Sequence, residues 1–406
     1  FSGCNSLGDV YYGSSVNVRT HYEVGWSKDS NDCLFNAIWH YGEEAEEGWD
    51  YCGNHVLYNY DSATRSMIIR GNGAMWDYTP SSTPPWTEYS SKIVSVTVEE
   101  GVSTIGNRAF YNFSRLETVV LPLSCTSIGD MSFDNCQNLM SINIPAATTG
   151  IGEYSFCNCS SLTEIILPTG VTSIGNSAFS GCTCLTNIIL SRNLAYIGSS
   201  AFSNCTALTS VDIPTGVLGI SESAFFNCSS LTSVFLPDSV TYIDNNAFNS
   251  CYKLNGITFP EGLSRIGAAA FRCCYSLTEI DLPEGLKVIG AFAFCTCTNL
   301  QSIIIPNSVE VIHYLAFMND CNLKTVVLPS SLEIINEKPF EGCANLKDVN
   351  LPISLKSIKA DAFNGCQQFS TVVVPDSVVE IGNHAFNGCR NVKEVTIGKS
   401  VKRISI

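Results

Sequence analysis

The sequence predicts an elongated solenoid of short coils, with a parallel β-sheet along one side and little α-helix. Three observations lead to this fold class. Phe recurs every 23 residues over most of the chain, Leu stands six residues after nearly every such Phe, and aliphatic residues follow nine and eleven residues after it. Repeats of this length form units too small to bury their apolar faces alone, so neighbouring units must stack.

Each unit carries the same residue types in the same order. An Ile lies five residues before every Phe and is usually followed by Gly, and Pro usually follows the second aliphatic residue. The Phe column comprises Phe110, Phe133, Phe156, Phe179, Phe202, Phe225, Phe248, Phe271, Phe294, Phe317, Phe340, Phe363 and Phe386.

The paired aliphatic residues predict a short strand in each unit, because side chains two residues apart point to the same face of a strand. Parallel strands lie about 4.8 Å apart, so the steps from the first Phe to the last give a sheet roughly 58 Å long. Pro lacks the N–H group that pairing needs and therefore ends each strand. The Gly after the Ile allows a positive φ or a close backbone approach, although Ser221, Asp244, His313, Asn336 and Lys359 replace it in other units.

This unit closely resembles the BspA-like leucine-rich repeats. Its pattern, A-F-x-x-C-x-x-L-x-x-I-x-L-P-x-x-V-x-x-I-G, is visible from Ala201 onward and in copies from Ile93 to the end of the chain. The resemblance implies a leucine-rich repeat solenoid with a curved parallel sheet on its concave face, and mostly turns with short irregular or 3-10 segments on its convex face. Phe113 and Asp320 replace the Cys and Pro339 replaces the Ala, so we expect local distortion there. We also expect Phe113, which is larger than Cys, to cover the apolar N-terminal end of the core.

Known proteins with such repeats are mostly bacterial surface proteins that adhere to host proteins or to other cells. The resemblance therefore implies an extracellular, secreted or cell-surface location, and a non-enzymatic module that binds a protein of the host extracellular matrix or of another cell surface. A structural spacer without a specific ligand is the alternative. A glycan-binding or hydrolytic site near Trp49, Trp76 and Trp86 is a third hypothesis, because aromatic side chains commonly line ligand pockets.

The chain is expected to divide into three parts. Residues 1–10 keep the spacing of the repeat from Phe1 to Val10 and are expected to be the tail of a preceding repeat. Residues 11–92, with all five Trp, are expected to form a non-repeat, aromatic-rich insert with short strands, and they resemble inserts of such proteins from gut Firmicutes. Residues 93–406 are expected to form about thirteen coils of 23 residues. Further protein is expected before and after the given sequence.

The composition argues against several classes of function. The chain has 406 residues, with 22 Lys and Arg against 37 Asp and Glu, and its net charge of −15 opposes binding to nucleic acid. No run of 18 apolar residues occurs, so no membrane span is expected. No phosphate-binding loop, zinc-protease motif or nucleophile elbow occurs, so neither a cofactor nor a catalytic site is expected. We also expect a monomer.

Eleven of the twenty Cys occupy one repeat position, three residues after the Phe. A free Cys behaves as a small buried hydrophobe, and coils about 4.8 Å apart place neighbouring Cβ atoms slightly too far apart for a disulfide, so we expect reduced thiols. Cys33, His40, Cys52 and His55 are the residue types of a zinc site, but their spacing fits no compact motif. A Cys33–Cys52 disulfide or two buried thiols are the preferred alternatives, and no metal site is expected.

The predicted ligand-binding residues lie on the strands, ten residues after the Phe, where side chains point away from the core. They form an apolar line interrupted by polar residues, and exposed apolar stripes often mark contacts. Phe235 between Asp212 and Thr258 has the composition of an interface hot spot. The alternative is that β-branched residues at these positions merely suit a strand. The predicted binding residues are Ile166, Ile189, Asp212, Phe235, Thr258, Asp281, Ile304 and Val327.

Overall fold

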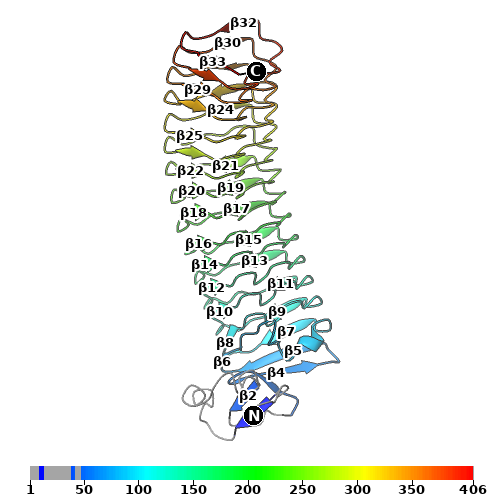
Figure 1. Cartoon of the computed structure of the whole chain (residues 1–406). Helices are drawn as coiled ribbons and strands as arrows, with labels where there is room; N and C mark the ends of the chain where they lie inside the picture. Colours follow the sequence, from blue (N-terminus) through cyan, green and yellow to red (C-terminus); the bar gives the residue numbers. More distant parts are fainter. Residues whose placement is uncertain (1–8, 13–37, 42–46, 406) are drawn as a thin grey trace, which may run out of the picture.

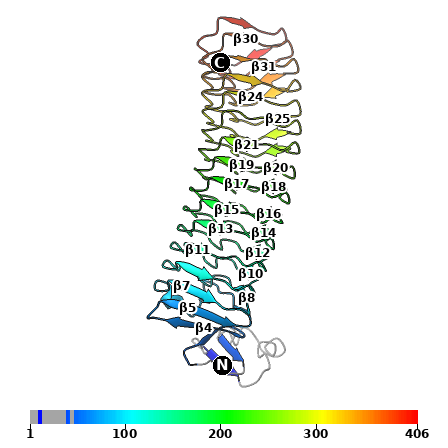
Figure 2. The ribbon, with the colours of Figure 1, turned by 180° about the vertical axis from the view of Figure 1, so that it is seen from behind.

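The protein forms an elongated column of stacked coils (Figure 1). The computed structural model describes residues 9–12, 38–41 and 47–405 of the chain. Two ladders of parallel strands run along the column, which bends only gently in both views (Figures 1 and 2). In the described residues the only helical element is a 3-10 turn, Thr87–Tyr89, so the predicted solenoid with little helix is confirmed.

The first sheet consists of the strands that the paired aliphatic residues predict. In its three-residue strands the middle side chain is generally buried and the outer two are exposed, as in Glu164–Ile166 and Ser302–Ile304. The ladder is interrupted in several places, most widely at residues 279–281, which contribute only one bridge, from Asp281 to Ile304. The strands are β7 (Ser95–Val98), β9 (Thr118–Val120), β11 (Ser141–Ile142), β13 (Glu164–Ile166), β15 (Asn187–Ile189), β17 (Ser210–Asp212), β19 (Ser233–Phe235), β21 (Gly256–Thr258), β24 (Ser302–Ile304), β26 (Thr325–Val327), β28 (Asp348–Val349), β30 (Thr371–Val373) and β32 (Glu394–Thr396).

A second sheet, which the sequence did not predict, runs along another side of the column where turns were expected. Nearly all of its strands have two residues and end in the Ile that lies five residues before each Phe. That Ile is buried in almost every coil, and most successive strands pair in parallel. The strands are β8 (Val102–Ile105), β10 (Ser127–Ile128), β12 (Gly150–Ile151), β14 (Ser173–Ile174), β16 (Tyr196–Ile197), β18 (Gly219–Ile220), β20 (Tyr242–Ile243), β22 (Arg265–Ile266), β23 (Val288–Ile289), β25 (Val311–Ile312), β27 (Ile334–Ile335), β29 (Ser357–Ile358), β31 (Glu380–Ile381) and β33 (Arg403–Ile404).

The Phe side chains form a continuous stack through the core. From Phe110 to Phe386, neighbouring ring centroids lie 5.3 to 5.6 Å apart and the ring planes differ by at most 13°. The stack continues past Asp320 and Pro339 with nearly the same ring spacing, whereas the second-sheet ladder is interrupted between β25 and β27, next to the Pro339 turn. The expected local distortion is therefore absent from the Phe stack but not from the sheet. The carbonyl of Pro339 also accepts a hydrogen bond from the N–H of Phe317, as the Ala carbonyls of other coils do.

The chain turns around each Phe of the stack, and two residues of this turn, which we call the Phe turn, adopt a left-handed backbone conformation. They lie two residues before and two residues after the Phe, as Tyr154 and Asn158 do around Phe156, with φ of 53° and 57°. The second position holds mainly Asn or Gly, the residues that tolerate this conformation best. The left-handed backbone therefore accounts for the Asn residues with which the Asn-x-Ser/Thr sequences at Asn158 and Asn204 begin.

The Gly that follows most of these Ile residues allows close packing and does not adopt a positive φ. Among the described residues, Gly152, Gly175 and Gly198 are not in the left-handed region. A Cβ added to Gly175 would lie 2.6 Å from the backbone nitrogen of Glu153 in the preceding coil. Of the two roles expected for this Gly, the structure shows the close approach alone.

The repeated Cys residues line one corner of the core as free thiols. Each of these eleven thiols donates to the carbonyl oxygen of the Phe in the preceding coil at 3.1 to 3.4 Å, as Cys205 does to Phe179. A small apolar side chain with a weak donor suits this position. The Cys position is therefore explained by packing and by this hydrogen bond.

The described part of the N-terminal block folds onto the first coil. Strands β3 (Asp50–Gly53), β4 (Val56–Asp61) and β5 (Ser66–Gly71) form an antiparallel meander, and β5 pairs in parallel with β7, so the first sheet continues across residue 93. The short β6 (Gly73–Ala74) likewise extends the second sheet. Farther out, β1 (Asp9–Tyr12) and β2 (Ile38–Tyr41) pair in parallel.

The N-terminal end of the Phe stack is covered by Trp86. Its ring stacks on Phe110 with centroids 5.7 Å apart, and its Nε1 donates to the carbonyl of Ala109 at 2.8 Å. Phe113, which we expected to cover this end, is buried within the first coil and meets the Phe110 ring edge to face. Trp86 is therefore the last ring stacked in parallel, and Tyr58 and Tyr78 pack edge-on against it.

Candidate binding surface

The predicted binding residues lie on the exposed face of the first sheet. We call the line formed by the eight predicted residues the first-sheet stripe. Its apolar members are between 49% and 67% exposed, with Ile189 the least and Ile304 the most exposed. Asp212, Thr258 and Asp281 are exposed as well, whereas the residues on either side of each stripe position along the chain are largely buried. The prediction that these side chains point away from the core is therefore confirmed, and their role in binding stays a prediction.

The strand register brings the stripe residues together in three groups. Ile166 pairs with Ile189 across β13 and β15. Phe235 lies between Asp212 and Thr258 across β17, β19 and β21. The third group contains Asp281, Ile304 and Val327, in which Asp281 bridges to Ile304 and Ile304 pairs with Val327. The hydrogen-bonded ladder does not continue from one group to the next.

Polar side chains border the stripe in regular rows. Thr186 and Thr232 each donate a hydroxyl hydrogen bond to the carbonyl of the equivalent Thr in the preceding coil, at 3.1 and 3.0 Å. The Asn187 amide donates to a carboxylate oxygen of Glu164 at 2.9 Å. The face therefore combines apolar side chains with ordered polar neighbours, which is the composition of a contact surface with a polar rim.

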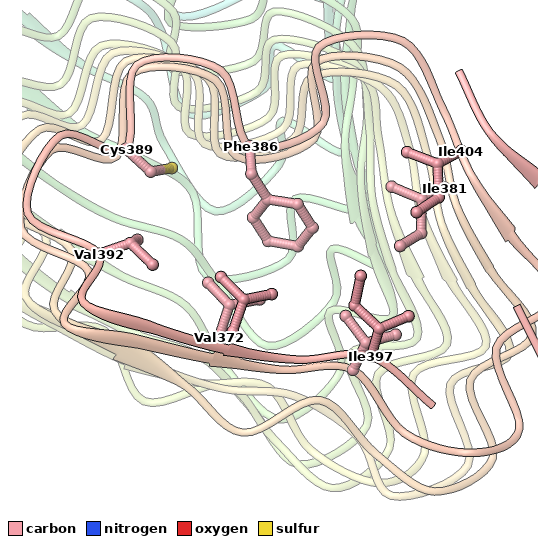
Figure 3. A pocket seen from close by; sticks show the side chains of 9 residues that line it. Val372, Ile381, Phe386, Cys389, Val392, Ile397 and Ile404 are labelled. Carbon is pink, nitrogen blue, oxygen red and sulfur yellow. The ribbon is translucent and has the colours of Figure 1, made fainter. Parts of the chain in front are cut away.

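An apolar cavity of about 230 Å³ opens at the C-terminal end of the column (Figure 3). Val372 projects into it from the first sheet, Ile381 from the second sheet and Phe386 from the Phe turn. Its only thiol is that of Cys389, whose pKa is raised to about 11 by burial. No acid, base or cation converges on the cavity, which is the open end of the core.

The described residues assemble no metal centre. Cys52 is fully buried whereas His55 is exposed, and no three His, Cys, Asp or Glu in that part of the chain are arranged to hold an ion. The side chains of Cys33 and His40 fall outside the described residues, so the four-residue zinc hypothesis and the Cys33–Cys52 pair stay untested.

The three Trp residues of the glycan hypothesis do not form one platform. Trp86 is fully buried, the guanidinium of Arg70 lies 3.7 Å from the ring centroid of Trp49, and Trp76 donates to Asn54 at 3.3 Å. Each ring therefore has a separate partner.

The comparisons with known proteins agree with this architecture. The sequence matches the BspA type leucine-rich repeat region at residues 88–209, 196–320 and 312–406. The chain belongs to the BspA-type leucine-rich repeat family. No curated protein matches the sequence.

Three bacterial proteins of known structure are similar to this BspA-type chain, and the first two share its fold. A leucine-rich repeat protein from Bacteroides ovatus is 27% identical, with a TM-score of 0.73 over 88% of this chain and 90% of that one. One from Eubacterium ventriosum is 24% identical, with a TM-score of 0.51 over 83% and 93% of the two chains. A leucine-rich cell surface protein from Faecalibacterium prausnitzii is 25% identical, with a TM-score of 0.43 over 87% and 95%.

The BspA-type column also carries an exposed apolar patch that the sequence did not indicate. Tyr196, Leu218 and Tyr242 lie on or beside the second sheet and are 49%, 63% and 38% exposed. A Cβ added to Gly219 would lie 2.2 Å from Cζ of Tyr242, so the Tyr242 ring covers the place of the missing side chain. Tyr196 and Tyr242 each precede the buried Ile of a second-sheet strand and point away from the core. The sequence did not predict this sheet, so it did not predict the patch either.

Proposed function

We propose that this BspA-type protein is an extracellular binding module whose first sheet contacts a protein of the host matrix or of another cell surface. The observation that carries the proposal is the exposure of five large apolar side chains in one line, Ile166, Ile189, Phe235, Ile304 and Val327. Apolar side chains that lie together on the exposed surface of a folded protein often mark a site of contact with another molecule. Repeat solenoids present such extended faces to their partners.

The remaining parts of the proposal concern location and activity. A secreted or cell-surface location is inferred from membership of the BspA-type family. In the described residues no helix is long and apolar enough to cross a membrane. We propose a monomeric, non-enzymatic protein that binds neither nucleic acid nor a cofactor.

The proposal is tested with substitutions on the two sheets. Phe235→Ala combined with Ile189→Ala removes apolar side chains from the first sheet, while Leu218→Ala combined with Tyr242→Ala removes comparable side chains from the second. Binding of the purified variants to immobilised host matrix proteins and to whole host cells is measured by surface plasmon resonance and flow cytometry. We expect the first-sheet variant to bind at least about fivefold more weakly, which corresponds to more than about 1 kcal/mol.

The second-sheet variant, with Leu218→Ala and Tyr242→Ala, is the control and should keep the affinity of the unsubstituted protein. Equal weakening by both variants, or weakening by the second-sheet variant alone, would move the contact off the first sheet. If no matrix protein or cell binds, and deletion of the protein thins the bacterial surface layer, the spacer alternative is favoured.

A further inference from the structure

The exposed face of the first sheet carries charge of a single sign over seven successive coils. Between Thr163 and Ile304, the outward-pointing strand positions hold four acidic residues and no Lys or Arg. The four are Glu164, Asp212, Glu279 and Asp281, and all are exposed. Basic side chains occur only outside this set of positions, as at Lys253 in the preceding turn and Lys324 in the next coil.

The two Asp residues of the stripe have no cationic partner among the described residues. The ion pairs found there involve neither Asp212 nor Asp281. The Glu164 carboxylate differs from them because it accepts the amide hydrogen bond of Asn187. Asp212 and Asp281 are thus the stripe carboxylates available to an external cation.

Phe235 lies on the line between these two carboxylates. Its ring is 60% exposed, and in the register it directly neighbours Asp212 on one side and Thr258 on the other. In the same strand as Thr258, Gly256 has no side chain, and a Cβ built there would have only ordinary contacts, the nearest at 3.4 Å. The surface beside Ser233, in the same strand as Phe235, is therefore open to a side chain of a partner.

The spacing of the carboxylates fits an extended peptide that runs along the column. Asp212 and Asp281 are three coils apart, which is about 14 Å at the spacing of about 4.8 Å between strands, and one of these three steps, from Thr258 to Asp281, is unpaired. An extended chain rises about 3.3 Å per residue, so residues four apart span about 13 Å and point to the same side. The peptide residue midway between these two points to the same side. Its side chain reaches the sheet between Phe235 and Thr258.

We propose that the first sheet binds an extended cationic segment of its protein ligand, with basic residues at positions i and i+4 paired to Asp212 and Asp281. An apolar residue at i+2 then packs on Phe235. This inference rests on the proposed function and names the chemistry of the ligand. The segment crosses the strands, so it binds through side chains and its affinity falls with added salt.

Charge complementarity favours this occupant over the others. A second copy of the chain carries the same net charge of −15, and an acidic partner would bring like charges together. A cationic peptide instead neutralises the two unpaired carboxylates while covering the exposed Phe235 ring.

The test uses fluorescently labelled synthetic peptides and the purified protein. The matched peptide contains Lys-Ser-Phe-Ser-Lys between neutral flanks, the register control contains Ser-Lys-Phe-Lys-Ser, and the charge control contains Glu-Ser-Phe-Ser-Glu. Fluorescence anisotropy at low and at high salt measures each affinity. We expect the matched peptide to bind at least about fivefold more tightly than the register control, to lose that binding at high salt, and the charge control not to bind.

Variants then separate specific pairing from general attraction. Asp212→Asn and Asp281→Asn should each weaken the matched peptide about three- to fivefold, as expected for exposed ion pairs. Glu164→Gln removes one charge from the same face outside the proposed contact and should change the affinity little. Thermal unfolding of each variant confirms that the fold is unchanged.

Two results would overturn the inference. One is equal affinity for the matched and register-control peptides, and the other is equal weakening by Glu164→Gln and Asp212→Asn. If the peptides do not bind while Phe235→Ala with Ile189→Ala still abolishes attachment to matrix proteins, the ligand chemistry is wrong and the proposed function stands. Peptide binding without any attachment to matrix proteins or cells would contradict the proposed function instead.

Discussion

Asp320 occupies the Cys position of its coil, where its carboxylate is buried with incomplete hydrogen bonding. Its side chain is fully buried, as are most of the repeated Cys side chains that lie three residues after the Phe in other coils. Its Oδ1 accepts a hydrogen bond from the backbone N–H of Cys297 at 2.7 Å, whereas its Oδ2 has no hydrogen-bond partner. Burial raises the pKa of the Asp320 carboxyl well above its ordinary value, so the folded state favours the protonated form.

Asp320→Cys is expected to stabilise the protein. The substitution restores the thiol ladder and removes an unsatisfied buried oxygen, which typically destabilises a fold by about 1 to 3 kcal/mol. The gain should increase with pH. Because the folded-state pKa is raised, the wild-type stability is complete below about pH 4 and falls as the pH rises toward the folded-state pKa. Urea unfolding of both proteins in acidic and neutral buffer measures the difference.

Asp320→Asn serves as the control for this prediction, because it keeps the shape of the side chain and cannot ionise. Its stability should lack the pH dependence while remaining below that of Asp320→Cys, since an amide is still a polar group without full pairing. Parallel pH profiles for the wild type and both variants would show that Asp320 does not ionise differently on folding.

At the scale of the structural element, the first-sheet strands were predictable and the second-sheet strands were not. A first-sheet strand places two aliphatic residues in the core around an outward one, as Ile165 and Leu167 do around Ile166, and this alternation is a strong signal. A second-sheet strand buries a single Ile, and its outward neighbour varies between residues as different as Tyr196 and Arg265. A strand of two residues, in which only the buried Ile recurs and the exposed residue varies, shows no alternating pattern in the sequence that would indicate a strand.

The same contrast applies to the candidate site. The direction of the stripe side chains followed from the alternation, so Phe235 and its neighbours were found from the sequence. The patch of Tyr196, Leu218 and Tyr242 needed a sheet that the sequence did not indicate. Trp86 lies 24 residues before Phe110, one residue off the repeat period, and no repeat pattern surrounds it. Its place on the Phe stack depends on tertiary packing alone.

Trp86 is expected to stabilise the N-terminal end through both its ring and its N–H group. Trp86→Phe keeps a ring on Phe110 but leaves the Ala109 carbonyl without the indole donor, so we expect a loss of about 1 to 3 kcal/mol. Trp86→Ala also opens a cavity at a fully buried position and should destabilise by about 3 to 5 kcal/mol. Urea unfolding followed by circular dichroism measures both, with the partly exposed Trp76→Phe as a control that should change little. Equal losses for the Phe and Ala variants would show that ring stacking contributes nothing.

At the scale of the whole molecule, the two ends of the column differ. The described N-terminal block closes one end with a meander and Trp86, whereas the other end opens into the apolar cavity of Figure 3. Side chains that are buried in the central coils are exposed in the last one, as Val395 and Ile404 are, at 56% and 55%. In a stack where each coil contacts only its neighbours, stability depends on how many neighbours a coil has. In a protein that consists of residues 1–406 alone, the C-terminal coils are therefore expected to open first.

Two equivalent Val residues test this gradient. Val211 and Val395 both lie nine residues after a Phe, in the fifth and the last coil, but Val211 is 2% exposed and Val395 is 56% exposed. Val211→Ala removes buried methyl groups between two neighbouring coils and should destabilise its surroundings by roughly 2 kcal/mol. Val395→Ala removes the same groups from a half-exposed position and should change stability by less than about 0.5 kcal/mol. Native-state hydrogen exchange resolves the effect coil by coil, and we expect the slowest exchange in the central coils and the fastest in the last. Equal destabilisation by the two substitutions, or uniform exchange along the column, would mean that the solenoid opens as one cooperative unit and that its exposed end is no weaker than its centre.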